Sequence, residues 1–121
     1  MKKVAVVTGA AQGMGYGTAI NFLKKGYNVV FTDKNIKYLS KNKKKILVDS
    51  NSNNFIIIES NVSQIKSCQN LFLKTFKKWS RIDILVNCAG IAGGKREGGH
   101  TLAEFEHTVT SFQKALVNAI S

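Results

Sequence analysis

The sequence predicts an α/β fold built on a doubly wound parallel sheet, and three observations predict it. Short apolar runs of strand length alternate with longer segments of helical periodicity along the 121 residues. A glycine-rich turn joins the first apolar run to the first helical segment. Apolar residues make up 44% and charged residues 21%, as in an ordinary globular protein, which excludes a disordered chain, a collagen-like chain and a coiled coil. We therefore expect one domain over residues 1–121, with about four strands and four helices.

The first half of the chain predicts two strands, each followed by a helix. Residues 3–7 and 28–32 are apolar runs typical of buried parallel strands. Residues 14–25 have helical periodicity, and Gly26 follows as a left-handed cap. The positions of this helix expected to face the core are Met14, Ala19, Ile20 and Leu23. Residues 36–45 predict a weaker, lysine-rich helix.

The second half repeats the alternation. Residues 55–59 and 82–86 predict the third and fourth strands, and between them a helix is expected from an N-cap at Ser63 to residue 79. The apolar stripe of that helix consists of Ile65, Cys68, Phe72, Phe76 and Trp79. A further apolar stripe over residues 102–120 predicts a fourth helix. Because crossovers between parallel strands are right-handed, these elements predict the nucleotide-binding half of a Rossmann-like fold.

The charge balance leaves a nucleic-acid partner open as an alternative. Eighteen basic and seven acidic residues give a net charge of +11, which suits a polyanion. Sixteen of the basic residues are lysines, however, whereas base readout and bidentate phosphate contacts favour arginine. We therefore favour a solvated surface, and a nucleic-acid binder would be recognised by an affinity that falls steeply with salt.

Cysteine usage and hydropathy predict a cytoplasmic protein without a metal site. Cys68 and Cys88 lie far apart, and no other cysteine or histidine stands at metal-ligand spacing, so buried thiols are expected. No apolar run approaches the roughly 20 residues that span a bilayer. The apolar run near the start of the chain is too short for a secretory signal.

The strongest functional signal is a turn with the pattern T-G-x-x-x-G-x-G, which starts at Thr8 and lies between a predicted strand and helix. That context is the one a phosphate-binding turn requires. Gly9 permits the tight turn, Gly13 lets the backbone approach a pyrophosphate, and Gly15 lets the helix pack against the strand. Free N–H groups at the helix start would hold the anion. The candidate cofactor-binding residues here are Gly9, Gln12, Gly13, Met14 and Gly15.

Asp33 is the second candidate, because it stands just past the second predicted strand. A carboxylate there can accept hydrogen bonds from both hydroxyls of an adenosine ribose and would repel a 2′-phosphate, which favours NAD over NADP. The neighbouring Lys34, also a candidate contact, weakens that preference. The alternative is an ordinary turn aspartate before the next helix.

The third element is Asn87-Cys88-Ala89-Gly90, at the end of the fourth predicted strand. Ligands of open α/β sheets lie beyond the carboxyl ends of the strands, and small residues there leave room for a cofactor. An asparagine side chain can also tie neighbouring strands together by hydrogen bonds to their backbone. The candidates are Asn87, Ala89 and Gly90.

Together these three elements resemble the short-chain dehydrogenase/reductase family, over residues 3–90 closely and over the last helix loosely. The turn, Asp33 and residues 82–87 are similar to the NAD-linked 15-hydroxyprostaglandin dehydrogenase branch, and to several others. The resemblance implies that Asn61 and Val62 contact the adenine, although the family usually has aspartate where Asn61 stands. It also implies hydride transfer between a nicotinamide and a small alcohol or ketone.

The sequence departs from the family in its catalytic residues. The family uses a tyrosine whose pKa is lowered by a lysine four residues later. The three tyrosines, Tyr16, Tyr27 and Tyr38, are followed at that distance by Ile20, Phe31 and Asn42. The catalytic serine and tyrosine would lie after residue 121, so we expect the chain to bind cofactor without catalysing the reaction and assign no catalytic residue. Alignment of the last predicted helix puts Phe112 at the position of the family's proton-relay asparagine, and Asn118 is a candidate only if the loop over residues 91–101 carries an insertion.

A non-enzymatic nucleotide-binding or interaction module is the alternative from a different class. A sheet that ends at the fourth strand exposes an edge, which favours a homo-oligomer.

Overall fold

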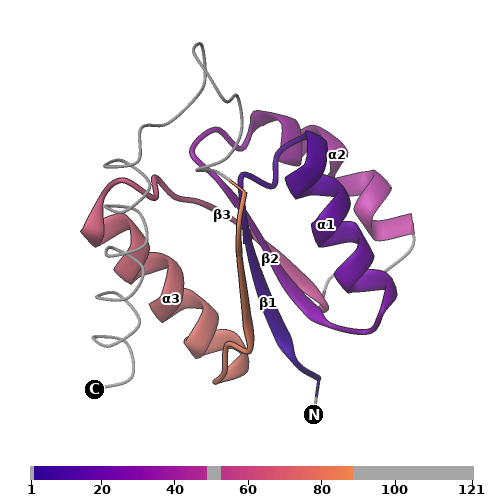
Figure 1. The fold of residues 1–121 in the computed structure, drawn as a ribbon. Coiled ribbons are helices and arrows are strands. Elements are labelled where there is room, and N and C mark those ends of the chain that lie inside the picture. Colours follow the sequence, from indigo (N-terminus) through magenta and orange to yellow (C-terminus); the bar gives the residue numbers. More distant parts are fainter. Residues whose placement is uncertain (1, 49–52, 89–121) are drawn as a thin grey trace.

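The computed structural model describes residues 2–48 and 53–88, which form a parallel sheet with helices on both faces (Figure 1). The order along the chain alternates strictly between strand and helix. The elements are β1 (Val4–Thr8), α1 (Gly13–Lys24), β2 (Asn28–Asp33), α2 (Lys37–Val48), β3 (Phe55–Glu59), α3 (Ile65–Trp79) and β4 (Ile84–Asn87). The predicted α/β fold and its four strands are thus confirmed, with bounds shifted by at most two residues. The fourth predicted helix lies outside the described residues.

The four strands lie in the order β3-β2-β1-β4 and all pair in parallel. β1 is central: Val7 pairs with Phe31 of β2 on one side, and Thr8 pairs with Asn87 of β4 on the other. The chain therefore moves outward from β1 through β2 to β3 and then returns to the opposite side of β1. This reversal places the carboxyl ends of β1 and β4 side by side, where ligands of open α/β sheets bind.

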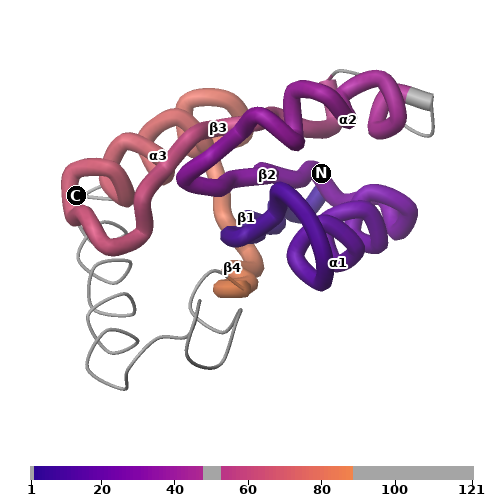
Figure 2. The backbone as a smooth tube through the Cα atoms, turned by 90° about the horizontal axis from the view of Figure 1, so that it is seen from above, coloured from indigo at the N-terminus to yellow at the C-terminus, as the bar shows by residue number. Residues whose placement is uncertain are grey.

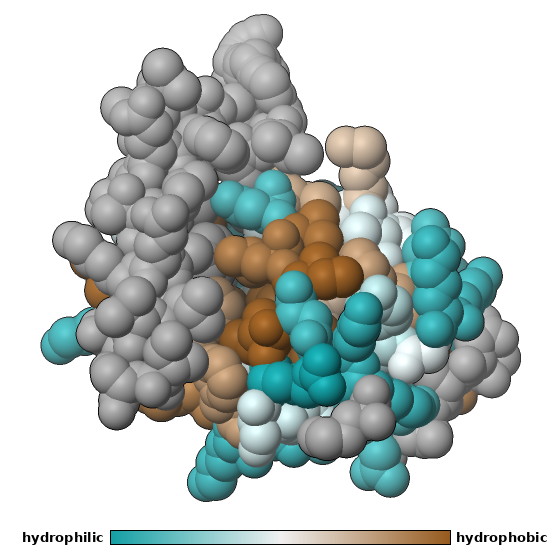
Figure 3. Space-filling model, turned by 60° about the horizontal axis from the view of Figure 1, so that its bottom comes forward, coloured by the Kyte–Doolittle hydropathy of each residue, from teal (hydrophilic) through white to brown (hydrophobic). Residues whose placement is uncertain are grey.

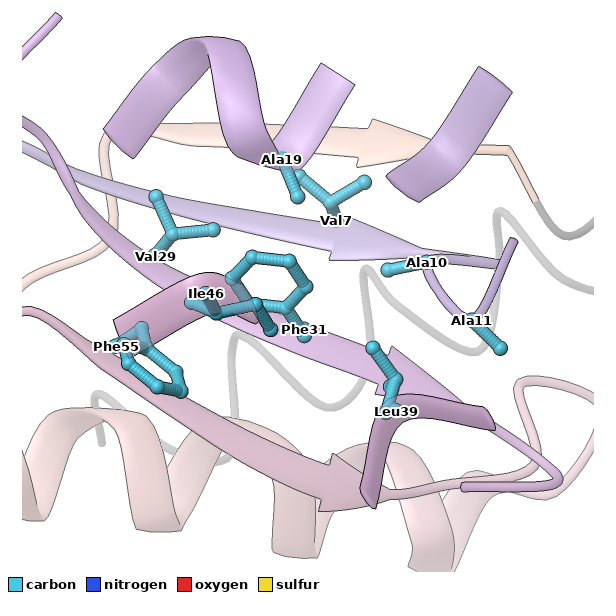
Figure 4. Packing of buried hydrophobic residues seen from close by; sticks show 9 residues of the cluster. All are labelled: Val7, Ala10, Ala11, Ala19, Val29, Phe31, Leu39, Ile46 and Phe55. Carbon is cyan, nitrogen blue, oxygen red and sulfur yellow. The ribbon is translucent and has the colours of Figure 1, made fainter. Parts of the chain in front are cut away.

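Two hydrophobic clusters fill the two faces of the sheet. α1 and α2 cover one face and α3 covers the other, as seen from above the sheet in Figure 2. The cluster under α1 and α2 contains Val7, Ala10, Ala11, Ala19, Val29, Phe31, Leu39, Ile46 and Phe55 (Figure 4). The cluster under α3 contains Val6, Val30, Ile58, Cys68, Leu71 and Phe72. Because alternate side chains of a strand point to opposite faces, β1 and β2 contribute to both clusters and read as continuous apolar runs.

Helix α1 ends as predicted but begins differently. Its last turn closes at Gly26, whose φ of 91° lies in the left-handed region and whose N–H donates to the carbonyl of Leu23 at 3.0 Å. Met14 is 73% exposed, so the expectation that it faces the core is wrong. The buried residues of α1 are Gly15 and Ala19, four positions apart on one side of the helix, and Met14 stands one residue before Gly15, off that side.

The N-cap predicted at Ser63 is also wrong. α3 begins at Ile65 after Gln64, which makes no side-chain capping bond. The N–H and the hydroxyl of Ser63 instead both donate to Oδ1 of Asn61, at 3.0 and 2.6 Å. Ser63 therefore closes the turn after β3, and the helix starts two residues later. Within residues 2–48 and 53–88, no helix is long and apolar enough to cross a membrane.

Candidate functional site

The turn between β1 and α1 depends on three glycines for two different reasons. Gly9 and Gly13 have φ values of 62° and 63°, in the left-handed region that favours glycine. Gly15 is buried, and a Cβ placed on it would lie 2.0 Å from the carbonyl oxygen of Gly9. The first turn of α1 therefore packs directly on the end of β1, with no room for a side chain. A Cβ on Gly13 would meet nothing within 4 Å, so the backbone there is open to a ligand.

The start of α1 leaves backbone donors available for an anion. Gln12 is the N-cap residue, its backbone is extended, and its side chain makes no capping bond. No acidic residue stands in the first turn. The first intrahelical bond runs from the N–H of Tyr16 to the carbonyl of Gln12 at 3.4 Å, so the amides before it have no partner within the helix. Together with the helix dipole, these amides can hold a phosphate.

Asp33 ends β2 with its carboxylate fixed by backbone amides. Its Oδ2 accepts a hydrogen bond from the N–H of Ala11 at 3.1 Å, and its Oδ1 accepts one from the N–H of Asn35 at 3.3 Å. The second bond is the one expected of a turn aspartate, whereas the first ties the carboxylate to the glycine-rich turn. Each oxygen keeps a lone pair for a further donor, such as a ribose hydroxyl. Lys34 follows directly and is exposed.

The segment after β3 is joined to the same edge of the sheet. The N–H of Ser60 donates to the backbone carbonyl of Asp33 at 3.0 Å. The next residue, Asn61, is half-buried, and its N–H donates to the hydroxyl of Ser67 at 2.8 Å. Val62 is also half-buried and packs against the cluster under α3. These contacts place Asn61 and Val62 next to Asp33, on the side of the sheet away from β1.

A direct side-chain bond links β1 to β4 at their carboxyl ends. The hydroxyl of Thr8 donates to Oδ1 of Asn87 at 2.7 Å, so this asparagine joins the strands through a side-chain partner and not through the backbone partner expected. Nδ2 of Asn87 is buried and has no hydrogen-bond partner in the part of the chain that the structure describes. Ala89 and Gly90 lie outside the described residues.

Both cysteines are buried and free. Burial raises the pKa of the Cys68 thiol to about 11 and raises that of Cys88 as well, so neither thiol is activated as a nucleophile. Burial also raises the pKa of Tyr16, the opposite of what a catalytic tyrosine base requires. Among residues 2–48 and 53–88, no group of histidine, cysteine and acidic side chains could hold a metal ion.

The structure thus gathers the candidates that it describes along one edge of the sheet. Sequence reasoning included Thr8 only as the first residue of the turn pattern and missed its bond to Asn87, and it missed the contacts of Ser60 and Ser67. Thr8 carried a usable signal, because it is a polar residue that ends an otherwise apolar strand. Ser60 and Ser67 carried none, since serines are common in turns and on exposed helix faces.

Comparisons with known proteins find one family. The family model described as short chain dehydrogenase matches residues 3–121. The rat protein 3-hydroxyacyl-CoA dehydrogenase type-2 (Rattus norvegicus) is 33% identical across 88% of this chain and 41% of its own length. The bovine enzyme 15-hydroxyprostaglandin dehydrogenase (Bos taurus), whose name specifies NAD(+), is 34% identical across 77% of this chain and 35% of its own length.

Solved structures agree on the fold. A short chain dehydrogenase from Mycobacterium smegmatis superposes with a TM-score of 0.74 and 26% identity, over 98% of this chain and 52% of that one. An alcohol dehydrogenase from Thermococcus sibiricus complexed with 5-hydroxy-NADP superposes with a TM-score of 0.75 and 23% identity, over 99% and 54%. The chain spans between 29% and 50% of the length of the first five curated relatives.

Proposed function

We propose, from the premise that this chain belongs to the short-chain dehydrogenase/reductase family, that it binds a nicotinamide dinucleotide and prefers NAD to NADP. The observation that carries the proposal is the bond between Ala11 and Asp33. This hydrogen bond joins the glycine-rich turn, which suits a pyrophosphate, to the Asp33 carboxylate, which suits a ribose.

The pyrophosphate would lie over the first turn of α1. A Cβ at Gly13 would meet nothing within 4 Å, and the amides of the helix start are not capped by the Gln12 side chain. Gly15 holds that helix start against β1, so the donors are fixed before the ligand arrives. A preorganised anion site of this kind loses little conformational entropy on binding.

The adenosine ribose would lie against Asp33. Because backbone amides hold both oxygens, the carboxylate cannot swing away from an added 2′-phosphate, and the two like charges would remain close. Exposed Lys34 would offset part of this repulsion. The 5-hydroxy-NADP in the T. sibiricus structure shows that the fold accepts a phosphorylated cofactor, so in this chain the choice rests on Asp33.

When bound, the nicotinamide supplies the hydride acceptor or donor for an alcohol or ketone carbon. In this chain Asp33, Gly13 and the amides of α1 bind and orient the adenosine end of the cofactor, and Thr8 and Asn87 hold the two strands beneath it. The family's tyrosine and lysine pair is not present in the 121 residues. We therefore expect cofactor binding without turnover from this chain alone.

Calorimetric titration with NAD and NADP tests the proposal. The wild-type chain should bind NAD at least about ten-fold more tightly than NADP. Asp33→Asn removes the charge and keeps an acceptor for only one of the two amides, so NAD should weaken while NADP strengthens. Gly13→Val forces a β-branched residue to a positive φ and should abolish binding of both.

Gly17→Ala is the matched control for Gly13→Val, because a Cβ at Gly17 also meets nothing within 4 Å but its backbone is ordinary helix. It should bind NAD like the wild type, and circular dichroism should show all variants folded. Absence of NAD binding by the wild-type chain at millimolar concentration would refute the proposal. So would wild-type affinity in both site variants.

An assay with NAD and a panel of secondary alcohols tests the expected lack of turnover. NADH formation by the pure 121-residue chain, well above background, would show that another residue replaces the tyrosine.

A homo-oligomer and a cytoplasmic location are also proposed. Leu85 of edge strand β4 is 40% exposed, which supports self-association, and light scattering of the purified chain tests it.

A further inference from the structure

A row of free ammonium groups follows α2 on the side away from the sheet. Leu39 and Ile46 are buried at 0 and 1% exposure and fix which side of the helix faces the core. With 3.6 residues per turn, positions 37, 41 and 44 then lie on the opposite side, and position 45 flanks them. The residues are Lys37, Lys41, Lys44 and Lys45, all exposed, and we call them the lysine strip.

No carboxylate of α2 neutralises the strip. The helix has no acidic residue. Over residues 2–48 and 53–88 the ion pair present joins Arg81 to Asp83, just before β4. Lys41 stands four residues from both Lys37 and Lys45, a spacing at which like charges destabilise a helix. A bound polyanion would remove that repulsion, so the helix itself gains from such a partner.

A hollow beside the strip adds an aromatic surface. It has a volume of about 540 Å³ and lies along the first half of α2. Its lining residues are Asn35, Ile36, Lys37, Tyr38, Ser40 and Lys41. Tyr38 is 51% exposed, so its ring is accessible to a ligand that also reaches the two lysines.

We propose that the lysine strip and Tyr38 form a binding surface for single-stranded nucleic acid. Cationic groups that follow the phosphates, next to an aromatic ring on which a base stacks, are the combination that such binders use. Lysine makes point contacts without reading base edges, so binding should be tolerant of sequence. A membrane surface fits less well, because it requires an apolar helix face, and that of α2 is buried in the core.

Fluorescence anisotropy with a labelled strand of sixteen thymidines tests the proposal on the full 121-residue chain. Affinity should fall as potassium chloride rises, with a logarithmic slope of about −2 to −3 for three or four phosphate contacts. The triple change Lys37→Gln, Lys41→Gln and Lys44→Gln should weaken binding at least ten-fold and reduce the slope by about 2. Tyr38→Ala should weaken it about five-fold or more, and Tyr38→Phe should not.

A matched control separates this surface from net charge. Changing Lys66, Lys74 and Lys77 of α3 to glutamine removes the same charge from exposed positions elsewhere. The affinity of that variant for the labelled strand should fall by less than about two-fold. Equal loss in both triple variants, or no binding by the wild type at low salt, would overturn the proposal. Displacement of the strand by millimolar NAD would also overturn it, because the hollow would then belong to the cofactor site.

Discussion

Gly15 is the residue at which α1 comes closest to the end of β1. Gly15→Ala should lower the free energy of unfolding by about 1–3 kcal/mol, since its Cβ would meet the backbone oxygen of Gly9 at 2.0 Å and the helix must shift. Gly17→Ala should instead raise it by about 0.5–1 kcal/mol, because alanine favours a helix and nothing obstructs it. Urea denaturation measures both. Equal effects of the two changes would show that the close approach does not constrain the fold.

Thr8 and Thr32 are both fully buried, but their hydroxyls differ in partners. Thr8 donates to Asn87, whereas the hydroxyl of Thr32 has no hydrogen-bond partner among the residues described. Thr8→Val should therefore destabilise the chain by about 1–3 kcal/mol, and Thr32→Val should be neutral or stabilising, because valine has the same shape without an unsatisfied polar atom. Thermal melts of the two variants check this, and a loss of stability in Thr32→Val would contradict it.

At the residue scale, the sequence predicted features of local backbone geometry better than it predicted hydrogen bonds between side chains. The glycines of the turn and the position of Asp33 follow from local rules about chain geometry. Met14 was placed wrongly because Gly15, and not Met14, stands four residues before Ala19 on the buried side of the helix. The bond from Thr8 to Asn87 joins residues 79 positions apart, so no local pattern could reveal it.

At the scale of elements, β1 and β4 are joined at both ends. At the amino end, the N–H of Val4 donates to Oδ2 of Asp83 at 2.8 Å, and the N–H of Asp83 donates to the carbonyl of Val4 at 2.9 Å. Arg81 donates to the same carboxylate through Nε and Nη2, at 2.8 and 2.6 Å. Thr8 and Asn87 make the corresponding contact at the carboxyl end. These contacts help to set the register of β4, a strand of only four residues.

The Asp83 contacts predict a dependence of stability on acid. The hydrogen bond from Arg81 and then that from the N–H of Val4 lower the pKa of Asp83. A lowered pKa in the folded state adds stability above the unfolded pKa of about 3.9, and this is lost as pH falls through the folded value. The urea midpoint should thus drop between pH 5 and pH 3, less in Arg81→Gln and least in Asp83→Asn. Parallel profiles for all three proteins would exclude this role.

The existence and order of the elements were predictable, because each strand is apolar on both faces and each helix has a stripe. The starts of the helices were not. Ser63 has the residue type of an N-cap, yet its hydroxyl bonds Asn61 in the preceding turn, and competition between two local hydrogen bonds decides where α3 begins. Leu71 and Thr75 are likewise buried although they lie off the predicted stripe, since the sheet covers a wider face of α3 than the periodicity suggested.

At the scale of the whole molecule, the described residues carry a strong excess of positive charge. The described residues include fifteen basic side chains but only three acidic ones, Asp33, Glu59 and Asp83. Within the described residues Asp83 pairs with Arg81, and no ion pair involves a lysine. Figure 3 shows hydrophilic side chains standing out around an apolar area on the face it presents. Repulsion among the basic side chains therefore opposes folding, and the free energy gained by burying the two hydrophobic clusters must exceed it.

This self-repulsion predicts that salt stabilises the chain. Three like-charge contacts in α2, between Lys41 and each of Lys37, Lys44 and Lys45, oppose the helix by about 0.2–0.5 kcal/mol each. Raising potassium chloride from 20 to 300 mM shortens the screening length and should raise the melting temperature by about 2 °C or more, since a domain of this size gains roughly 2–8 °C per kcal/mol. The glutamine variant of Lys37, Lys41 and Lys44 should melt at a higher temperature at low salt, and its melting temperature should change less with salt.

The glutamine variant of Lys66, Lys74 and Lys77 in α3 is the control. Its changed lysines include only one neighbouring pair, so its melting temperature should keep most of the dependence on salt. A melting temperature that falls with salt would mean instead that attractive pairs, such as Arg81 with Asp83, outweigh the repulsion along α2.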